Sequence, residues 1–276
     1  MSDEVVTASV SAEAETSSLL LSGKVAVITG GTSAIGRACA TRLVANGAKV
    51  VVADVNASVG AEVVRAISET GGQLRYLQAN SAERLDVHNL IATTLEAYGF
   101  VDILICAASE EEETPFLELR EEHFDRSVRS RLKGTFLSSQ AVAKQFILQQ
   151  QQGRTAGTII TAGSAGLIAD DVPATASAAS RGGVMELTKT IASAVASHGI
   201  RVNAIGPLTV AGGEPSVENG KEDANKDTIA DRQAHWDSYV EDVAKLVTWL
   251  VSEHASHVSG EVVFVGDRRA QVSNLA

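Results

Sequence analysis

Short runs of β-branched residues alternate with longer segments of helical periodicity from Gly23 onward. This alternation is typical of a parallel sheet whose strands are joined by helices. We predict strands at residues 24–29, 49–54, 74–79, 101–107, 157–162, 200–205 and 262–265. Seven strands in this order indicate a single α/β domain, a doubly wound parallel sheet flanked by helices on both faces.

The segments between these strands carry apolar residues at helical spacing. Two of them end at Gly47 and Gly99, which we expect to be C-caps. The longest pattern covers residues 118–152, where Phe124, Val128, Leu132 and Phe136 recur every four residues. It predicts one long helix whose last residues, 149–152, are all glutamine and fray into solvent.

Two segments lack such a pattern. Residues 1–22 contain no basic residue, and therefore no positively charged start of a secretory signal, so we predict a disordered tail. Residues 211–231 are almost free of apolar side chains and predict a mobile polar loop. The domain proper is expected to span residues 23–276.

Composition narrows the possible functions. The 276 residues carry a formal net charge of -11, which argues against binding nucleic acid or anionic lipid, and no apolar run approaches a membrane span. Cys39 and Cys106 fall in a predicted helix and a strand end, so neither a disulfide framework nor a metal site is expected. His254 and His257 are expected to be surface residues rather than metal ligands. We therefore expect a cytoplasmic protein.

A glycine-rich stretch, TGGTSAIG at residues 29–36, follows the first strand and opens a helix. Such a turn presents backbone N–H groups and a helix dipole to a pyrophosphate. Asp54 ends the second strand, where its carboxylate could bind both ribose hydroxyls and repel a 2′-phosphate, which favours NAD over NADP. The alternatives are a turn kept for packing and an Asp54 that caps the next helix.

These motifs, together with RVNAI at 201–205 and SGEVV at 259–263, resemble the short-chain dehydrogenase/reductase family over residues 23–267. The resemblance implies a Rossmann-type sheet, dimers or tetramers, and hydride transfer between a nicotinamide and an alcohol or carbonyl carbon. It also implies NAD contacts at Gly30, Thr32, Ser33, Ile35, Gly36, Asp54, Asn80, Ala107 and Pro207.

The family's catalytic positions depart from its pattern. The tyrosine position is Ser177, the lysine position four residues later is Arg181, and the asparagine position is Arg131. The serine position is filled by Ser164. A serine hydroxyl is too basic and too short to replace the tyrosine acid, and a guanidinium is always charged.

Cofactor positions are altered as well. Ala34 replaces the middle glycine of the loop, where its methyl group can crowd the phosphates. The strand-four motif, in the family close to Asn-Asn-Ala-Gly, is CAAS at residues 106–109, and four glutamates follow at 110–113. Leu208 replaces a glycine, and Gly212 stands where a threonine often holds the carboxamide.

Three functions remain open. The first is a catalytically silent subunit, resembling non-catalytic subunits of hetero-oligomeric family members. It would complete a hetero-tetramer through residues 118–148 and 174–197. Its active partner would act on a secondary alcohol such as a hydroxyacyl thioester. The second is a homo-oligomeric, unconventional NAD-dependent oxidoreductase in which Arg131 and Arg181 stabilise an oxyanion. The third is a sensor of NAD or another small ligand. Ser164 and both arginines could also be structural. The arginines would then fill the vacant nicotinamide space or pair with the glutamates at 110–113.

Overall fold

The computed structural model describes residues 19–69, 71–108, 114–162, 175–207 and 229–265. Its sheet contains seven parallel strands in the order β3-β2-β1-β4-β5-β6-β7. The strands are β1 (Val25–Thr29), β2 (Lys49–Asp54), β3 (Leu74–Gln78), β4 (Ile103–Cys106), β5 (Thr158–Ala162), β6 (Arg201–Pro207) and β7 (Val262–Val265). The single doubly wound Rossmann-type sheet is therefore confirmed, and each strand lies within two residues of its predicted bounds.

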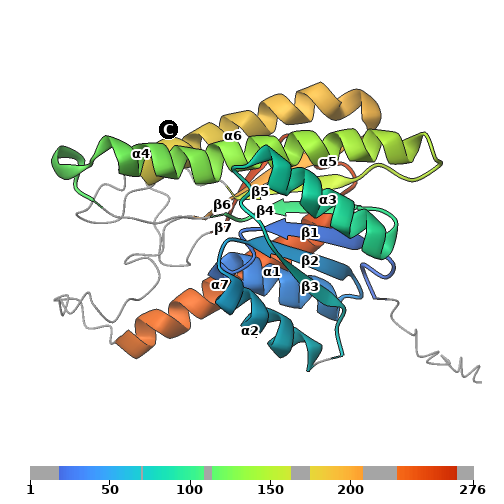
Figure 1. Cartoon of the computed structure of the whole chain (residues 1–276), viewed down its shortest axis with the longest axis horizontal. Helices are drawn as coiled ribbons and strands as arrows, with labels where there is room; N and C mark the ends of the chain where they lie inside the picture. Colours follow the sequence, from blue (N-terminus) through green and yellow to red (C-terminus); the bar gives the residue numbers. More distant parts are fainter. Residues whose placement is uncertain (1–18, 70, 109–113, 163–174, 208–228, 266–276) are drawn as a thin grey trace, which may run out of the picture.

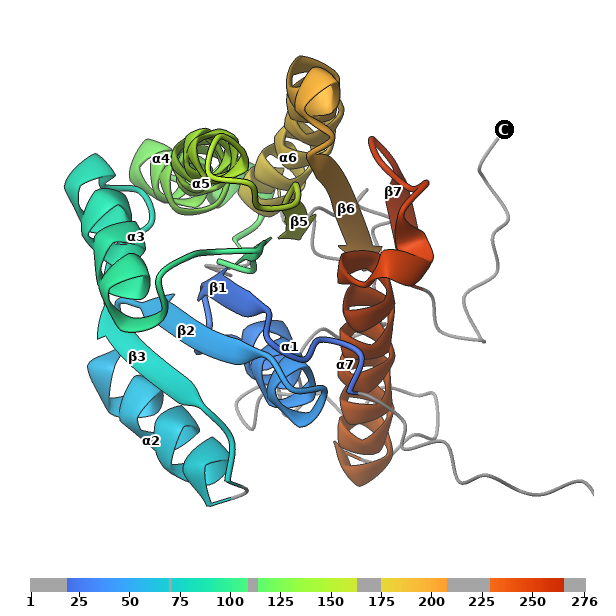
Figure 2. The same cartoon turned by 90° about the vertical axis from the view of Figure 1, so that its right-hand side faces the viewer.

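Helices cover both faces of the sheet (Figures 1 and 2). One layer holds α3 (Arg84–Tyr98), α4 (Glu121–Ser127), η2 (Val128–Lys133), α5 (Gly134–Gln150) and α6 (Thr175–Val195). The opposite layer holds α1 (Ala34–Ala45), α2 (Ala57–Ser68) and α7 (Ile229–Val251). Three short 3-10 turns complete the described chain: η1 (Phe116–Glu118), η3 (Ala196–His198) and η4 (Glu253–Ala255). None of the helices in the described ranges is both long and apolar enough to cross a membrane.

The core consists of two apolar clusters, one on each face of the sheet. Val27 belongs to the cluster that also holds Phe146 of α5, while its neighbour Ile28 belongs to the cluster with Leu250 of α7. Successive strand residues point to opposite faces, and both faces are covered here, so the central strands are apolar at every position. This burial explains why short β-branched runs identified the strands.

The chain becomes ordered before the predicted domain start. Leu21 is only 1% exposed, belongs to the core, and its N–H donates to the carbonyl of Asn46 at 2.9 Å. The prediction of a disordered tail through residue 22 is therefore wrong at its C-terminal end. The predicted polar loop is also too long, because α7 begins at Ile229; its residues 211–228 lie outside the described part of the chain.

The long helix predicted over 118–152 is interrupted by a change of pitch. α4, η2 and α5 follow one another without a break, but η2 is a π-helix and η1 lies apart from it. A repeat of one apolar residue every four positions is longer than the 3.6 residues per turn of an α-helix. The wider turn of a π-helix accommodates this difference. Of the two predicted C-caps, Gly99 is confirmed, since it caps α3 in the left-handed region. Gly47 is not the cap of α1, because Asn46 caps that helix and Gly47 follows it with φ 89°.

The end of α5 also differs from the prediction. Gln149 is 2% exposed, its side-chain amide donates to the carbonyl of Val101 at 2.7 Å, and its side-chain oxygen accepts from the N–H of Val101 at 3.0 Å. The prediction that residues 149–152 fray is wrong for this residue. Gln149 satisfies both backbone groups of the residue that leads into β4, and so it joins α5 to the sheet.

We expect Gln149→Leu to lower the free energy of unfolding by about 2–3 kcal/mol, because two buried backbone groups lose their partners. The exposed Gln152 offers a matched control in the same glutamine run. Gln152→Leu should change stability by less than about 0.5 kcal/mol. Urea denaturation measures both, and equal midpoints for the two variants would contradict the role given to Gln149.

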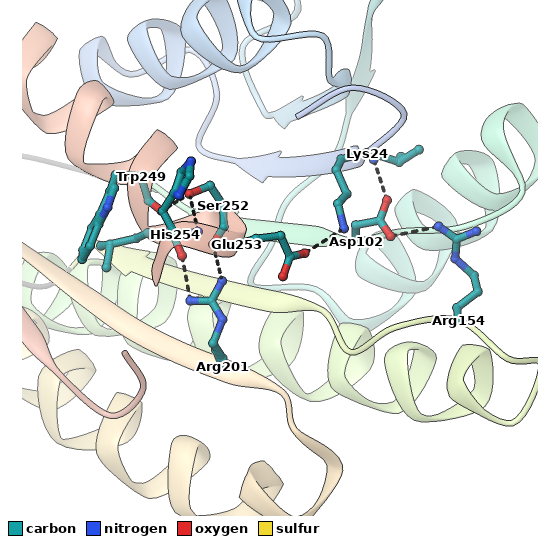
Figure 3. A network of polar contacts seen from close by, with 10 residues as sticks. Lys24, Asp102, Arg154, Arg201, Trp249, Ser252, Glu253 and His254 are labelled. Atoms are coloured by element: carbon teal, nitrogen blue, oxygen red, sulfur yellow. Dashed lines mark hydrogen bonds and ion pairs between the residues drawn. The ribbon is translucent and has the colours of Figure 1, made fainter. Parts of the chain in front are cut away.

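Polar contacts join several elements at the amino edge of the sheet (Figure 3). The buried carboxylate of Asp102 accepts from the N–H of Val25 at 2.8 Å and pairs with Arg154 at 3.0 Å. Arg201 donates to the carbonyls of Leu250 at 2.7 Å and Ser252 at 3.2 Å, which satisfies the C-terminal end of α7. These contacts tie β1, β4, β6 and α7 together at this edge.

Candidate functional site

The order of the strands creates a crevice at their carboxyl ends. The chain runs outward in one direction from β1 to β3 and in the other from β4 to β7, so adjacent connections diverge next to β1 and β4. Ligands of doubly wound sheets bind at such a switch point. A pocket of about 380 Å³ lies at this point. Its lining residues are Gly30, Thr32, Ser33, Asp54, Val55, Ala79, Asn80, Ser81, Ala82, Ala108, Arg126, Arg129 and Ser130.

The glycine-rich turn forms one wall of this pocket and is held by its own side chains. The hydroxyl of Ser33 accepts from the N–H of Gly36 at 3.0 Å and thereby caps α1. The same hydroxyl lies 2.7 Å from the carbonyl oxygen of Gly30 and 3.2 Å from that of Ala107. Ala34 is the first residue of α1 and is partly buried. Ser33 thus fixes the turn against the end of β4.

Gly30 has a conformation and a position that exclude a side chain. Its φ is 70°, and a Cβ there would lie 2.2 Å from the backbone nitrogen of Ala108. Gly36 is packed as closely, since its Cβ would lie 2.3 Å from the carbonyl oxygen of Gly30. Both glycines are therefore required by the path of the backbone.

Asp54 connects the end of β2 to the same turn. Its Oδ2 accepts from the N–H of Thr32 at 3.0 Å, and its Oδ1 accepts from the N–H of Val55 at 2.7 Å. The side chain that caps α2 is Asn56, which accepts from the N–H of Val59 at 3.2 Å. The alternative that Asp54 caps this helix is wrong. Its carboxylate lines the pocket, as binding of a ribose would require.

Asn80 lies across the pocket, in the turn between β3 and α3. Its Oδ1 accepts from the N–H of Ala82 at 3.0 Å, and its own N–H donates to Asp86 at 2.8 Å. The turn is thereby held rigidly, with Asn80 in the pocket wall. Two other expected cofactor contacts, Ile35 and Ala107, lie beside the glycine turn, and Pro207 ends β6.

Two of the four expected catalytic positions meet directly. Arg131 lies in the π-helical segment η2 and is 3% exposed, and Ser177 lies in α6 and is 5% exposed. The Arg131 Nη1 donates to the hydroxyl of Ser177 at 2.8 Å and to that of Ser180 at 3.2 Å. The Ser180 hydroxyl in turn lies 3.1 Å from that of Ser127. Arg131 therefore crosslinks η2 and α6.

The remaining expected positions are less informative. Arg181 is partly buried on α6, and Ser164 lies outside the described residues, as do Ser109, Glu110–Glu113, Leu208 and Gly212. The structure adds residues that the sequence analysis missed: Ser180 beside Arg131, and Arg126, Arg129 and Ser130 in the pocket wall. Arg126 and Arg129 are three residues apart, a helical spacing that places both on one face and could have identified them.

Both cysteines are buried thiols. Burial raises the pKa of Cys106 from 9.0 to about 12, an effect that the hydroxyls of Thr29, Ser139 and Thr135 partly offset. Burial, with the nearby charge of Glu241, likewise raises the pKa of Cys39 to about 12. The two cysteines are free of disulfides and are held as neutral thiols at physiological pH.

We expect neither thiol to react with an aromatic disulfide reagent at pH 8 in the folded protein, because the thiolate is the reactive form and a pKa near 12 lowers its population about a thousandfold. In urea both thiols should react at the rate of an ordinary cysteine. Fast labelling of one thiol in the folded chain would contradict the burial described here.

Comparisons with known proteins agree with this architecture. The family model described as short chain dehydrogenase matches residues 24–221. A 3-oxoacyl-[acyl-carrier-protein] reductase from Synechocystis is 37% identical over 69% of this chain and 76% of its own length. A 2,5-dichloro-2,5-cyclohexadiene-1,4-diol dehydrogenase from Sphingobium indicum is 34% identical over 87% of this chain and 94% of its own.

Solved structures show the same likeness. A short-chain type dehydrogenase/reductase from Mycobacterium marinum superimposes with a TM-score of 0.76 at 25% identity, covering 90% of this chain and 96% of the other. The overall fold described above is thus shared with this solved structure.

Proposed function

Because the chain belongs to the short-chain dehydrogenase family of oxidoreductases, we propose that it is a family member without hydride-transfer activity of its own, which serves as a subunit beside an active relative. The observation that carries the proposal is the contact between Arg131 and Ser177. The family's reaction needs a side chain that exchanges a proton with the alcohol or carbonyl oxygen. Here the position of that side chain is a buried serine bonded to a permanent cation.

Neither residue can take over the proton transfer. A serine hydroxyl does not ionise near neutral pH, and a guanidinium is not deprotonated in proteins. Ser177 is 5% exposed, and its hydroxyl already accepts from Arg131. The lysine position holds Arg181, which keeps its charge and cannot pass on a proton. All of these substitutions act against catalysis while leaving the packing of η2 on α6 intact.

The residues of the crevice fit one part of the family's cofactor. The glycine turn, Asp54 and Asn80 line a pocket, and Ala34 is not among its lining residues. These residues would hold the adenosine and phosphates of NAD, the group whose nicotinamide accepts or supplies a hydride when bound. Asp54 presents a negative charge to the ribose, which supports NAD rather than NADP.

We place the active partner on the face formed by α4, α5 and α6. The apolar stripe along this long helix is only half covered within the chain, since Phe124 and Phe136 are 38% and 39% exposed. Leu132, in the same stripe, lies against Gly183 of α6, where a Cβ would be 2.9 Å from its side chain. A partner that packs on residues 118–148 and 174–197 would cover this stripe. A cytoplasmic complex is in keeping with two free, buried cysteines.

A turnover assay tests the silence of the chain. A homogeneous preparation is incubated with NADH or NAD and with 3-oxoacyl thioesters, ketones and secondary alcohols, and absorbance at the nicotinamide band is followed. We expect no consumption above the protein-free rate. Turnover that disappears in the Ser164→Ala variant would contradict the proposal, because it would show that the chain performs the family's chemistry.

A second function, an unconventional oxidoreductase, is favoured by one observation: the Arg131 guanidinium is held rigidly in the catalytic position. A fixed cation can stabilise a developing oxyanion, with water supplying the proton. This function requires Arg131 itself, so turnover that is retained in Ser164→Ala and lost in Arg131→Gln would identify it.

A further inference from the structure

The turn that follows β2 carries Asp54 and lies beside the neighbouring strand β3. Asp54 is the last residue of β2 that pairs with β3, where its partner is Gln78. Beyond this pair the chain turns toward α2, which begins at Ala57. The carbonyl groups in this turn lie past the end of the strand ladder, so they need other hydrogen-bond donors.

Two side chains of β3 supply these donors. The hydroxyl of Tyr76 donates to the carbonyl of Asp54 at 2.7 Å, alongside the N–H of Ala79 at 3.0 Å. The side-chain amide of Gln78 donates to the carbonyl of Val55 at 3.2 Å. Tyr76 and Gln78 are two residues apart on one strand, so they lie on the same face of the sheet. Strand β3 thus holds two successive carbonyl groups of the turn.

The ring of Tyr76 is in turn fixed by α2. A Cβ at Gly60 would lie 2.2 Å from the ring atom Cε2 and 2.4 Å from Cδ2, so the ring packs directly on the backbone of α2. Burial and the charge of Asp54 raise the pKa of Tyr76, so its hydroxyl stays protonated and remains a donor at neutral pH. One side chain therefore joins β3, α2 and the end of β2.

The carboxylate of Asp54 depends on this backbone for its direction. Its Oδ2 accepts from the N–H of Thr32 and its Oδ1 from the N–H of Val55, and each oxygen keeps a lone pair for a further donor. An acceptor that is already oriented binds a hydroxyl group with a smaller loss of conformational entropy. Of the two side chains that hold the turn, Tyr76 is partly buried and Gln78 is exposed, so the bond of Tyr76 is the better protected from water.

We propose that Tyr76 is a positioning residue for the nucleotide, because its hydroxyl fixes the end of β2 so that the Asp54 carboxylate meets the hydroxyl groups of the adenosine ribose. The inference rests on the proposed function, in which Asp54 holds that ribose. It adds a residue of β3 that is not among the lining residues of the pocket. Tyr76 acts through the backbone of Asp54 and not by contact with the ligand.

Two ligands and one conservative variant test the proposal. Isothermal titration calorimetry on the full chain compares NAD with an analogue that lacks the 2′-hydroxyl of the adenosine ribose. We expect the wild-type chain to prefer NAD about tenfold, because this hydroxyl donates to a charged acceptor. Tyr76→Phe keeps the ring on Gly60 and loses only the hydroxyl. In this variant the preference should fall to about threefold.

The preference for NAD over the analogue separates positioning from a merely structural role. A general loosening of the fold would weaken both ligands equally and leave their ratio unchanged. An unchanged ratio in Tyr76→Phe would therefore overturn the inference. Equal binding of the two ligands by the wild-type chain would overturn it as well, because Asp54 would then not meet the ribose hydroxyl.

Tyr98→Phe is the matched control. Tyr98 lies in α3, where its ring centroid is 5.5 Å from the Nζ of Lys49, and it is not among the lining residues of the pocket. Lys49 and Asp54 are the first and last residues of β2, so Tyr98 lies near the opposite end of that strand. The variant should leave both affinities unchanged. A fall in the ratio as large as that in Tyr76→Phe would contradict a specific role for the bond to Asp54.

Gly60→Ala reaches the same hydroxyl from α2. The added Cβ must displace the Tyr76 ring, so we expect the preference for NAD to fall at least as far as in Tyr76→Phe. Gly182→Ala is its control, because a Cβ at this helical glycine would meet no atom within 4 Å. A preference that survives in Gly60→Ala would show that the position of the ring does not matter.

The two proposals fail in different ways. Turnover by the isolated chain would end the proposal of a silent subunit. Absence of NAD binding at millimolar concentration would end both this inference and the NAD site of the proposed function. NAD binding with an unchanged ratio in Tyr76→Phe would end only the role given to Tyr76.

Discussion

Gly30→Ala is expected to abolish NAD binding and to lower the free energy of unfolding by about 2–5 kcal/mol. The residue has φ 70°, a conformation that L-residues with a side chain rarely adopt. An added Cβ would also lie 2.2 Å from the nitrogen and 2.3 Å from the Cα of Ala108. These are backbone atoms, so no rotation of a side chain can relieve the clash. The turn must move away from β4, and the pocket wall moves with it.

Gly153 provides the control for this prediction. It has φ 85°, but a Cβ there would meet no atom within 4 Å. Gly153→Ala should therefore cost only the conformational strain, about 1–2 kcal/mol, and leave NAD affinity unchanged. Urea denaturation and calorimetry measure the two effects. Normal NAD binding by Gly30→Ala would show that the turn does not form the nucleotide site as described.

Phe146→Ala is expected to lower the free energy of unfolding by about 3–5 kcal/mol. The ring is fully buried between α5 and the sheet. It lies directly on Gly157, where a Cβ would be 2.3 Å from the ring atom Cζ. Because glycine has no side chain that could move into the vacated space, the cavity remains largely open. Loss of the ring thus removes both apolar burial and packing contacts.

Leu148 lies on the same helix and is 52% exposed, so it serves as the matched control. Leu148→Ala should cost less than about 1 kcal/mol. The shift in urea midpoint at constant slope measures each effect. A cost for Phe146→Ala below that for Leu148→Ala would place the core elsewhere than between α5 and the sheet.

The sequence was sufficient to predict the sheet. Strands buried on both faces are apolar at every position, and this pattern can be recognised without knowledge of the tertiary contacts. The glycine turn was equally predictable, because only glycine fits at Gly30 and Gly36. The residue type at these positions therefore indicates the path of the backbone.

Contacts between distant segments were not predictable in this way. Gln149 was interpreted as part of a solvated glutamine run, because nothing local shows that its amide meets Val101. The bond between Arg131 and Ser177 joins residues 46 positions apart and depends on how η2 packs on α6. Leu21 was assigned to the tail because the apolar block of residues 19–21 is too short to show periodicity. In each case the decisive partner lies elsewhere in the chain.

The site combines a preserved frame with changed chemistry. The residues that shape the glycine turn pack as closely as the backbone allows, whereas Arg131 and Ser177, which we propose occupy the family's catalytic positions, bind one another. Such a combination is expected when the fold and its surfaces are needed and the reaction is not. It explains why the chain is similar to named reductases and dehydrogenases while we propose a different role for it.

The most direct test of this account is the native mass and subunit identity of the tagged chain isolated gently from its own host. The account predicts a complex that contains, in stoichiometric amount, a second short-chain dehydrogenase with an intact Tyr-x-x-x-Lys pair. A complex built from copies of this chain alone would contradict it.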